Sequence, residues 1–196
     1  MIAYLRGRLV RKEPTHIIVE VGGIGYEASI SLNTFSEIKD QEEIRLLTYL
    51  HVREDAHLLY GFASEAEKTM FLHLISVNGV GPNTAMVVLS SLPPAELKSA
   101  ILREDGATLQ AVKGIGGKTA QRLILELKDK LRKEVDDAPS IIPGLINNTL
   151  RQEALTALMT LGIARAAGEK SIDAVLKKSG NKISLEDLVK QALKNA

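Results

Sequence analysis

The first part of the chain alternates apolar and polar residues over short segments rich in β-branched side chains. Alternation with a period of two predicts strands that are buried on one face. Breaks at Glu13-Pro14 and Gly22-Gly23 separate the first segments. Five short strands within about 60 residues favour a small closed barrel, for which an OB-fold is the expected form. The predicted strands are residues 2–11, 16–21, 26–31, 45–53 and 57–62.

From residue 64 onward the apolar residues recur with helical spacing. Ser64 and Glu67 have the pattern of a capping box, in which each side chain accepts a hydrogen bond from the backbone amide of the other. Pro82 suits the first turn of a second helix, where its missing N–H costs nothing. Asp105 is a candidate N-cap for a short helix, and a long charged helix is predicted from Thr119 to about residue 134.

This helical region contains one pattern twice. Gly79-Val80-Gly81 is followed by Thr84-Ala85, and Gly114-Ile115-Gly116 is followed by Thr119-Ala120, at an offset of 35 residues (114 − 79). Each copy predicts a helix, a turn of the form Gly-apolar-Gly, and a second helix. Glycines there supply a positive φ or allow close approach to the backbone, and the residue between them points inward.

Such turns leave unpaired backbone N–H groups at a helix N-terminus, which suits a phosphate oxygen. Two of them favour a clamp on a nucleic-acid backbone that does not read bases. The alternative is a pair of connectors that only pack a small helical domain. A solenoid is disfavoured because such arrays need three or more repeats.

The last third of the chain begins with a segment rich in proline, glycine and asparagine, which predicts a linker. Thr149 and Gln152 then suggest another capping box, and leucine-rich stripes predict three short helices, the last of them capped by Ser184. The expected fold class is therefore a multidomain α+β chain. It comprises an OB-fold barrel at 1–63, a tandem helical domain at 64–134, a linker at 135–148 and a three-helix bundle at 149–196.

Composition adds only modest constraints. The chain has 196 residues, a formal net charge of +1 and no cysteine, which excludes disulfides and cysteine-based zinc sites. Residues 64–135 hold 10 Lys and Arg against 8 Asp and Glu, so the repeat region is only weakly basic and backbone amides must carry more of any phosphate binding. The N-terminus has no signal-peptide pattern and no apolar run reaches about 18 residues, so a cytoplasmic location without membrane contact is expected.

Two further glycine patterns resemble nucleotide-binding motifs. Gly23-Ile24-Gly25 begins a G-x-G-x-x-A match, but the residues after it alternate as a strand, which favours a β-hairpin turn over a dinucleotide site. Gly117-Lys118-Thr119 ends like a Walker A loop, but Val112 stands where the first glycine is required. Lys118 is better interpreted as a supplement to the backbone amides in binding phosphate.

Two adjacent carboxylates, Glu54 and Asp55, lie between the last two predicted strands. On spacing alone they favour a solvated turn at a hairpin tip. A metal-binding or general-acid role with His51 and His57 is compatible with the residue types, but nothing in the sequence defines the geometry, and surface histidines are the simpler interpretation.

The repeated unit, at Asn78 to Gly81 and Lys113 to Arg122, resembles the helix-hairpin-helix motif. Together with residues 53–62, Arg-Glu-Asp-Ala-His-Leu-Leu-Tyr-Gly-Phe, it makes the whole chain similar to the RuvA family. These proteins are the Holliday-junction-binding subunits of the bacterial branch-migration complex. The resemblance implies the same OB-fold barrel and a non-catalytic role in recombination and repair, with no cofactor and no metal.

The resemblance also implies site residues. Glu54 and Asp55 would form an acidic pin at the centre of a four-way junction, where repulsion from phosphates keeps the strands apart. Leu155, Leu158, Leu161 and Ile163 would contact the motor. The implied DNA contacts are Asn78, Gly79, Val80, Gly81, Asn83, Thr84, Lys113, Gly114, Ile115, Gly116, Gly117, Lys118, Thr119 and Arg122.

The implied partners are the four-way DNA junction, the RuvB ATPase motor and the RuvC resolvase, and the implied assembly is a homotetramer or two tetramers stacked as an octamer. This chain departs from the family at Pro82-Asn83 and Gly117, where extra lysines are common, which predicts weaker binding with a smaller salt dependence. Three alternatives stay open: a generic helix-hairpin-helix DNA-binding repair protein, a nuclease or ATPase, and a protein scaffold without DNA contact.

Overall fold

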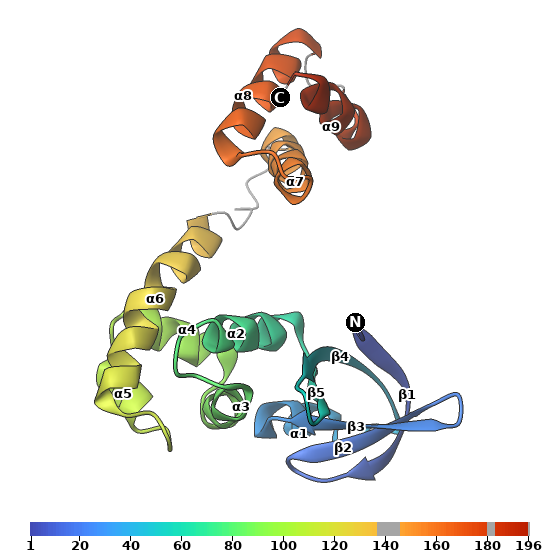
Figure 1. Ribbon diagram of the computed structural model, residues 1–196, viewed down its shortest axis with the longest axis vertical. Helices are drawn as coiled ribbons and strands as arrows, with labels where there is room; N and C mark the ends of the chain where they lie inside the picture. The colour runs from blue at the N-terminus through green and yellow to red at the C-terminus, as the bar shows by residue number, and fades with distance from the viewer. Residues whose placement is uncertain (137–145, 180–182, 196) are drawn as a thin grey trace. The chain divides into compact units, whose positions relative to one another are not determined.

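The computed structural model describes residues 1–136, 146–179 and 183–195. The chain divides into two compact units, Met1–Asp136 and Asp137–Ala196 (Figure 1). The predicted linker at 135–148 falls mostly on residues outside the described ranges.

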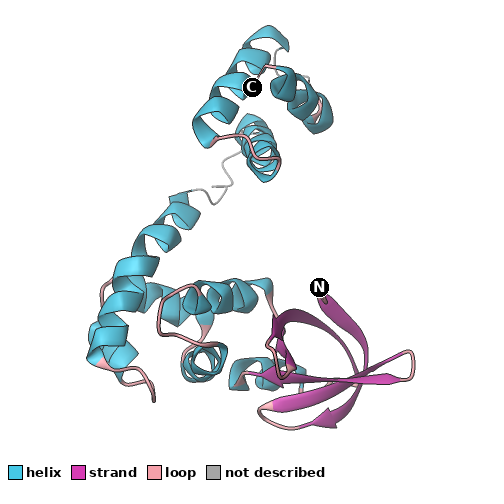
Figure 2. Ribbon diagram, in the orientation of Figure 1, coloured by secondary structure: helices cyan, strands magenta, loops and turns pink. Residues whose placement is uncertain are grey.

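The N-terminal part is a closed barrel of five strands in the order β1-β2-β3-β5-β4, with β1 also paired to β4 (Figure 2). All neighbours are antiparallel except β3 and β5. This topology confirms the predicted OB-like barrel. The strands are β1 (Tyr4–Lys12), β2 (His16–Val21), β3 (Ile24–Ile30), β4 (Glu43–Val52) and β5 (His57–Phe62).

The turn between β2 and β3 shows which structure the Gly23-Ile24-Gly25 pattern adopts. Gly22 and Gly23 have φ values of +60° and +84°, and Ile24 begins a strand. Positive φ at both central residues suits a tight hairpin turn, so the segment is a β-hairpin as expected.

A helix that the sequence did not predict, α1 (Leu32–Ile38), follows β3. Ser31 caps it by accepting a hydrogen bond of 3.0 Å from the backbone N–H of Thr34. Lys12 donates to the carbonyl oxygens of Lys39 and Gln41 just beyond the other end of the helix, at 3.2 and 2.6 Å. The seven residues of α1 are too few to show a helical period, which explains why the pattern was missed.

The second part of the first unit contains α2 (Glu65–Ile75), α3 (Pro82–Ser91), α4 (Pro94–Leu102), α5 (Gly106–Gln110) and α6 (Gly117–Asp136). Asp105 caps α5 as predicted, accepting from the backbone N–H of Thr108 at 3.1 Å. The helices share one core with β4 and β5. Its largest fully buried side chains include Phe62, Phe71, Leu74, Leu89, Leu97, Ile101, Leu109, Leu123, Leu127 and Leu131.

Helix α2 attaches this helical part to the barrel. The ring of Phe71 lies 4.9 Å from that of Phe62 and 5.4 Å from those of Tyr49 and Tyr60, measured between centroids. The barrel and α2 therefore pack as one body, since the same aromatic cluster contains side chains from both, and the other helices of this part share its core.

Glu67 adds a buried polar contact at this junction. Ser64 caps α2 as predicted, but the carboxylate of Glu67 turns toward α1 and accepts hydrogen bonds from the hydroxyls of Ser31 and Thr34. Only 1% of Glu67 is exposed, and burial raises its pKa above the ordinary value, against the lowering effect of the two hydroxyl bonds. Glu67 thus links the barrel to the helical part, a role that the capping-box prediction did not include.

The second unit contains α7 (Ile146–Thr160), α8 (Arg165–Ser179) and α9 (Leu185–Lys194) around a small apolar core. Three helices were predicted here, and Ser184 caps the last of them as expected. The predicted cap at Thr149 is wrong, because α7 begins at Ile146 and Thr149 lies within the helix.

Within the described ranges, no single helix is long and apolar enough to cross a membrane. Helices α3 and α4 together would be long and apolar enough to cross a membrane, but they are bent by 97° relative to each other. Most of their apolar residues lie in the core described above, although Val87 is exposed.

Candidate nucleic-acid interface

The two hairpins have the same backbone structure, bond for bond. In the first, the N–H of Val80 donates to the carbonyl of Val77 at 3.0 Å, and in the second the N–H of Ile115 donates to Val112 at 3.1 Å. The hydrogen bond at the start of the next helix is also the same in both hairpins. The N–H of Ala85 donates to the carbonyl of Gly81 at 3.0 Å, and the N–H of Ala120 donates to the carbonyl of Gly116 at 2.9 Å. All four apolar turn residues are buried: Val77, Val80, Val112 and Ile115. The sequence repeat is therefore a structural repeat.

The two glycines of each turn differ in backbone conformation and in whether the fold requires a glycine. Gly79 and Gly114 both have a φ of +90°, a conformation that side-chain-bearing residues rarely adopt. Gly81 and Gly116 lie outside the positive-φ region, and a Cβ added at either would meet no atom within 4 Å. The chain's own packing does not require glycine at these two positions. A bare backbone there lets an external group approach closely.

The helix after each turn presents backbone donors to that surface. Gly81 is the N-cap of α3 and makes no side-chain capping bond, and α6 begins at Gly117 directly after Gly116. The first N–H groups of a helix have no intrahelical acceptor, and they carry the positive end of the helix dipole. Asn78, Asn83, Lys113 and Lys118 are exposed around the two turns, and Thr84 and Thr119 are half-buried. This arrangement suits a phosphate group at each hairpin.

Arg122 connects the two hairpins. Its Nη1 donates a hydrogen bond of 3.0 Å to the carbonyl oxygen of Asn78, in the turn of the first hairpin. The side chain remains about half exposed and lies 4.0 Å from the carboxylate of Glu126. The predicted DNA contact at Arg122 is therefore also a link between the hairpins, placing a positive charge where both meet.

Tyr60 and Asn83 connect the first hairpin to the barrel. The Tyr60 hydroxyl, on β5, donates a hydrogen bond of 3.0 Å to Oδ1 of Asn83, near the start of α3. Tyr60 is only 3% exposed, and burial raises the pKa of its hydroxyl. Tyr60 was not among the predicted site residues, because no local sequence pattern shows that β5 and α3 come together.

The predicted acidic tip lies between β4 and β5. The backbone N–H of Arg53 donates to the carbonyl of Ala56 at 2.8 Å, which closes the turn. Glu54 and Asp55 are exposed, and Asp55 forms an ion pair of 3.4 Å with Nε of Arg53. In the part of the chain that the structure describes, no group of three or more acidic or histidine side chains is arranged to hold a metal ion.

Comparison with known proteins agrees with this architecture. Residues 1–61 match the RuvA N terminal domain, and residues 71–129 match the SAM-like Helix-hairpin-helix tandem. A protein of Cytophaga hutchinsonii called "Holliday junction branch migration complex subunit RuvA" is 55% identical, over 99% of both chains. The chain belongs to the RuvA family. Proteins of the same printed name from Amoebophilus asiaticus and Flavobacterium psychrophilum are 50% and 43% identical, over 99% and 100% of this chain and all of theirs.

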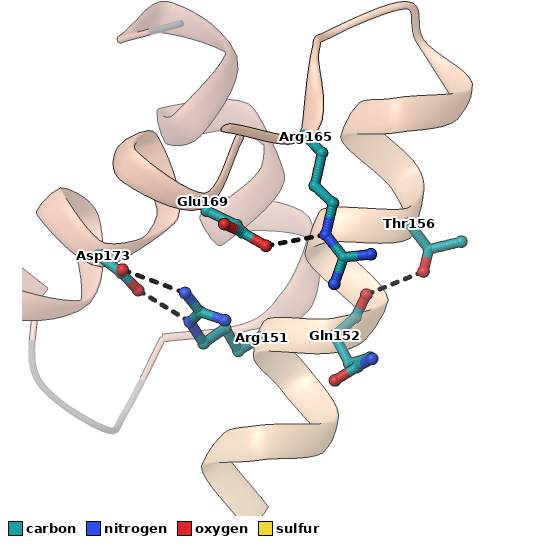
Figure 3. Close-up of polar contacts among 6 residues, drawn as sticks. All are labelled: Arg151, Gln152, Thr156, Arg165, Glu169 and Asp173. Atoms are coloured by element: carbon teal, nitrogen blue, oxygen red, sulfur yellow. Dashed lines mark hydrogen bonds and ion pairs between the residues drawn. The ribbon is translucent and has the colours of Figure 1, made fainter. Parts of the chain in front are cut away.

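In this RuvA-family chain, the second unit is held together by polar contacts as well as its core. Arg151 on α7 donates two hydrogen bonds to Asp173 on α8, at 2.8 and 3.1 Å, and these bonds lower the pKa of the Asp173 carboxyl (Figure 3). Arg165 pairs with Glu169 at 3.0 Å within α8. The bidentate contact fixes α7 against α8, because it holds both guanidinium and carboxylate in one orientation.

The structure corrects two of the four residues predicted to contact the motor. Leu158 is fully buried, and Leu155 is 5% exposed, because both face α8 and α9 in the core of this RuvA-family bundle. Leu161 is 61% exposed and Ile163 is half-buried. Met159, which was not among the predicted motor contacts, is 47% exposed. It borders a groove of about 460 Å³ lined by Gln152, Leu155, Thr156, Met159, Thr160 and Arg165.

Proposed function

We propose that this chain binds four-way DNA junctions through the phosphate backbone, holds their strands apart and recruits an ATPase motor for branch migration. The observation that carries the proposal is the repeated pair of hairpins, in which Gly81 and Gly116 are bare although the chain's own packing leaves room for a side chain. Relatives that are similar over their full length are called Holliday junction branch migration complex subunits, which supports a junction as the ligand.

The hairpins favour backbone binding without sequence specificity. Their donors are backbone N–H groups at the starts of α3 and α6, together with the exposed side chains of Lys113 and Lys118. Such groups match phosphate oxygens and carry no information about bases. The offset of one hairpin from the other is maintained by the bond from Arg122 to Asn78, which suits contact with neighbouring phosphates on one arm.

Glu54 and Asp55 would act by repulsion. Both carboxylates are exposed at a hairpin tip that is attached through β5 and Tyr60 to the first hairpin. In a homotetramer of fourfold symmetry, with or without a second tetramer stacked on it, four such tips would meet where the arms cross. Negative charge among converging phosphates opposes restacking of the arms. The chain supplies shape and charge, and it carries out no chemical step of its own.

The second unit would bind the motor, for which the family suggests RuvB, and the complex would also admit the RuvC resolvase. Met159, which lines the groove together with Arg165, and Leu161, which follows the last residue of α7, are exposed apolar residues. Exposed apolar side chains with a polar rim are typical of protein contacts. Leu158, which is fully buried, is no longer part of the expected docking site, whereas Leu155 contributes to it only as part of the groove lining.

The test compares binding of the full-length chain to a four-way junction and to a linear duplex of equal length, at two salt concentrations. Strong preference for the junction, weakened by salt, is expected. The Lys113→Ala, Lys118→Ala double variant should weaken binding to both DNAs, whereas Lys39→Ala, an exposed lysine at the end of α1, should not. Equal binding to both DNAs would indicate a generic helix-hairpin-helix protein, and no binding would indicate a scaffold.

A further inference from the structure

The two hairpins differ in the donors that they offer. Counting by the 35-residue offset, Pro82 corresponds to Gly117 and Asn83 to Lys118. Proline has no backbone N–H, so the first helix start lacks a donor that the second has. It also lacks the lysine. The first hairpin is therefore poorer in both backbone and charged donors than the second, although the backbone structure of the two turns is the same.

The side chain of Asn83 is held in a defined orientation. Its Oδ1 accepts the 3.0 Å hydrogen bond from the Tyr60 hydroxyl, and the residue is otherwise exposed. An asparagine amide has one acceptor and one donor edge. Because Oδ1 accepts from Tyr60 and Asn83 is exposed, we expect the two N–H donors of Nδ2 to be available to an external group at the start of α3.

Tyr60 is itself firmly placed. It lies on β5, pairs across the sheet with Tyr49, and its ring packs 5.4 Å from the ring of Phe71. Because the ring is 3% exposed, its hydroxyl has little freedom to find another acceptor. The barrel thus dictates which edge of the Asn83 amide faces outward.

We propose that Tyr60 is a positioning residue that orients the amide of Asn83 as an uncharged phosphate donor, in the place that Lys118 occupies in the second hairpin. The inference rests on the proposed phosphate binding at this site. It makes the first hairpin a neutral clamp and the second a charged one, so the two contribute differently to the salt dependence of binding.

The test is a double-mutant cycle by fluorescence anisotropy on a labelled four-way junction, using the full-length chain. Tyr60→Phe and Asn83→Ala should each weaken binding by about 3- to 10-fold, the usual effect of one hydrogen bond. The double variant should be no weaker than Asn83→Ala alone, because Tyr60 acts only through that amide. Tyr49→Phe, which removes the hydroxyl of the cross-strand neighbour, should bind as the unmodified chain does.

Two further readouts separate positioning from a structural role. The slope of log affinity against log salt should be unchanged by Tyr60→Phe and Asn83→Ala, whereas Lys118→Ala should reduce it by about 0.9, the effect of one phosphate contact. Asn83→Asp keeps the acceptor for Tyr60 and removes the donors, so it should retain thermal stability and lose affinity.

Additive losses in the cycle, a reduced salt slope for Tyr60→Phe, or full affinity of Asn83→Asp would each overturn the inference. These results presuppose a chain that binds the junction. If the unmodified chain binds no DNA, the proposed function itself fails, so the two failures are distinguishable.

Discussion

The guanidinium of Arg122 donates a 3.0 Å hydrogen bond to the carbonyl oxygen of Asn78, across a sequence separation of 44 residues. Arg122 belongs to the helix of the second hairpin and Asn78 to the turn of the first. One side chain therefore joins the two repeats, and it remains about half exposed beside the carboxylate of Glu126. The same residue contributes to the geometry of the interface and to its charge.

Replacing Arg122 by alanine should affect both properties. We expect a loss of roughly 0.5–1 kcal/mol in the free energy of unfolding, since the hydrogen bond is half exposed. The salt slope of junction binding should fall by about 0.9. Arg132→Ala, on the exposed face of the same helix, should change neither quantity. Urea unfolding and salt-dependent anisotropy measure the two effects. A destabilised variant with full affinity would show that Arg122 is only a structural link.

The two glycines of each turn should respond differently to alanine. Gly79→Ala and Gly114→Ala should each cost about 1–2 kcal/mol of stability, because a φ of +90° is unfavourable for a residue with a Cβ. Gly81→Ala and Gly116→Ala should stay within about 0.5 kcal/mol of the unmodified chain, since the added carbon meets nothing.

At Gly81 and Gly116, the second glycine of each turn, alanine should reduce junction affinity rather than stability. Gly81→Ala and Gly116→Ala place a methyl group where a phosphate is proposed to approach, so binding should weaken despite intact stability. Thermal unfolding and anisotropy on the same samples provide the comparison. Undiminished binding by both variants would show that no phosphate approaches the backbone closely at these two positions.

Glu67 predicts a specific pH dependence of stability. Burial raises its pKa, so the folded chain binds this proton more tightly than the unfolded chain does. The stabilisation is fully present below the unfolded-state pKa and is lost as the pH rises through the folded-state pKa. Glu67→Gln is neutral throughout. The difference in unfolding free energy, unmodified chain minus Glu67→Gln, should therefore decrease as the pH rises from about 4, the ordinary pKa of a glutamate carboxyl, into the neutral range.

Urea unfolding across that range measures this difference. Glu65→Gln provides the matched control, because Glu65 is an exposed carboxylate in the first turn of the same helix. The difference in unfolding free energy between the unmodified chain and Glu65→Gln should not decrease in this way as the pH rises. A Glu67→Gln difference that is constant or grows with pH would show that the buried carboxyl is not the titrating group.

Neutralising the acidic tip should change the shape of a bound junction more than its affinity. The Glu54→Gln, Asp55→Asn variant removes two charges that repel phosphate, so affinity should be retained or increased, and stability should change by less than about 0.5 kcal/mol. Fluorescence energy transfer between labelled arms should report a more stacked junction than with the unmodified chain. Glu42→Gln, Glu43→Gln, at the opposite end of β4, is the control. An unchanged arm geometry would argue against a pin.

Variants of two leucines in the second unit should distinguish a role in stability from a role in motor binding. Leu158→Ala should cost about 2–5 kcal/mol within the bundle, because Leu158 is fully buried. Leu161→Ser should leave stability within about 0.5 kcal/mol, because the side chain is 61% exposed, and should weaken capture of the purified motor. Calorimetry measures the stability of each variant, and a binding assay with RuvB measures its capture of the motor. Full motor binding by Leu161→Ser would place the docking site elsewhere.

Local patterns in the sequence were sufficient for much of this fold. Alternation predicted the strands of the barrel, and the repeated Gly-apolar-Gly unit predicted both hairpins, because period and turn chemistry act over a few neighbouring residues. The caps at Ser64, Asp105 and Ser184 were predicted for the same reason. Helix α1 was missed because it is short, and the start of α7 was misplaced because a polar residue also fits inside a helix.

The sequence by itself determined which segments are strands, helices and hairpins, and which residues could contact phosphate. Only the tertiary structure decided how these residues are connected: Tyr60 to Asn83, Arg122 to Asn78, and Glu67 to Ser31 and Thr34. It also decided that Leu158 is core and Leu161 is surface. The physical reason is that a helical stripe shows which residues share a face, whereas burial and long-range hydrogen bonds depend on which elements pack against that face.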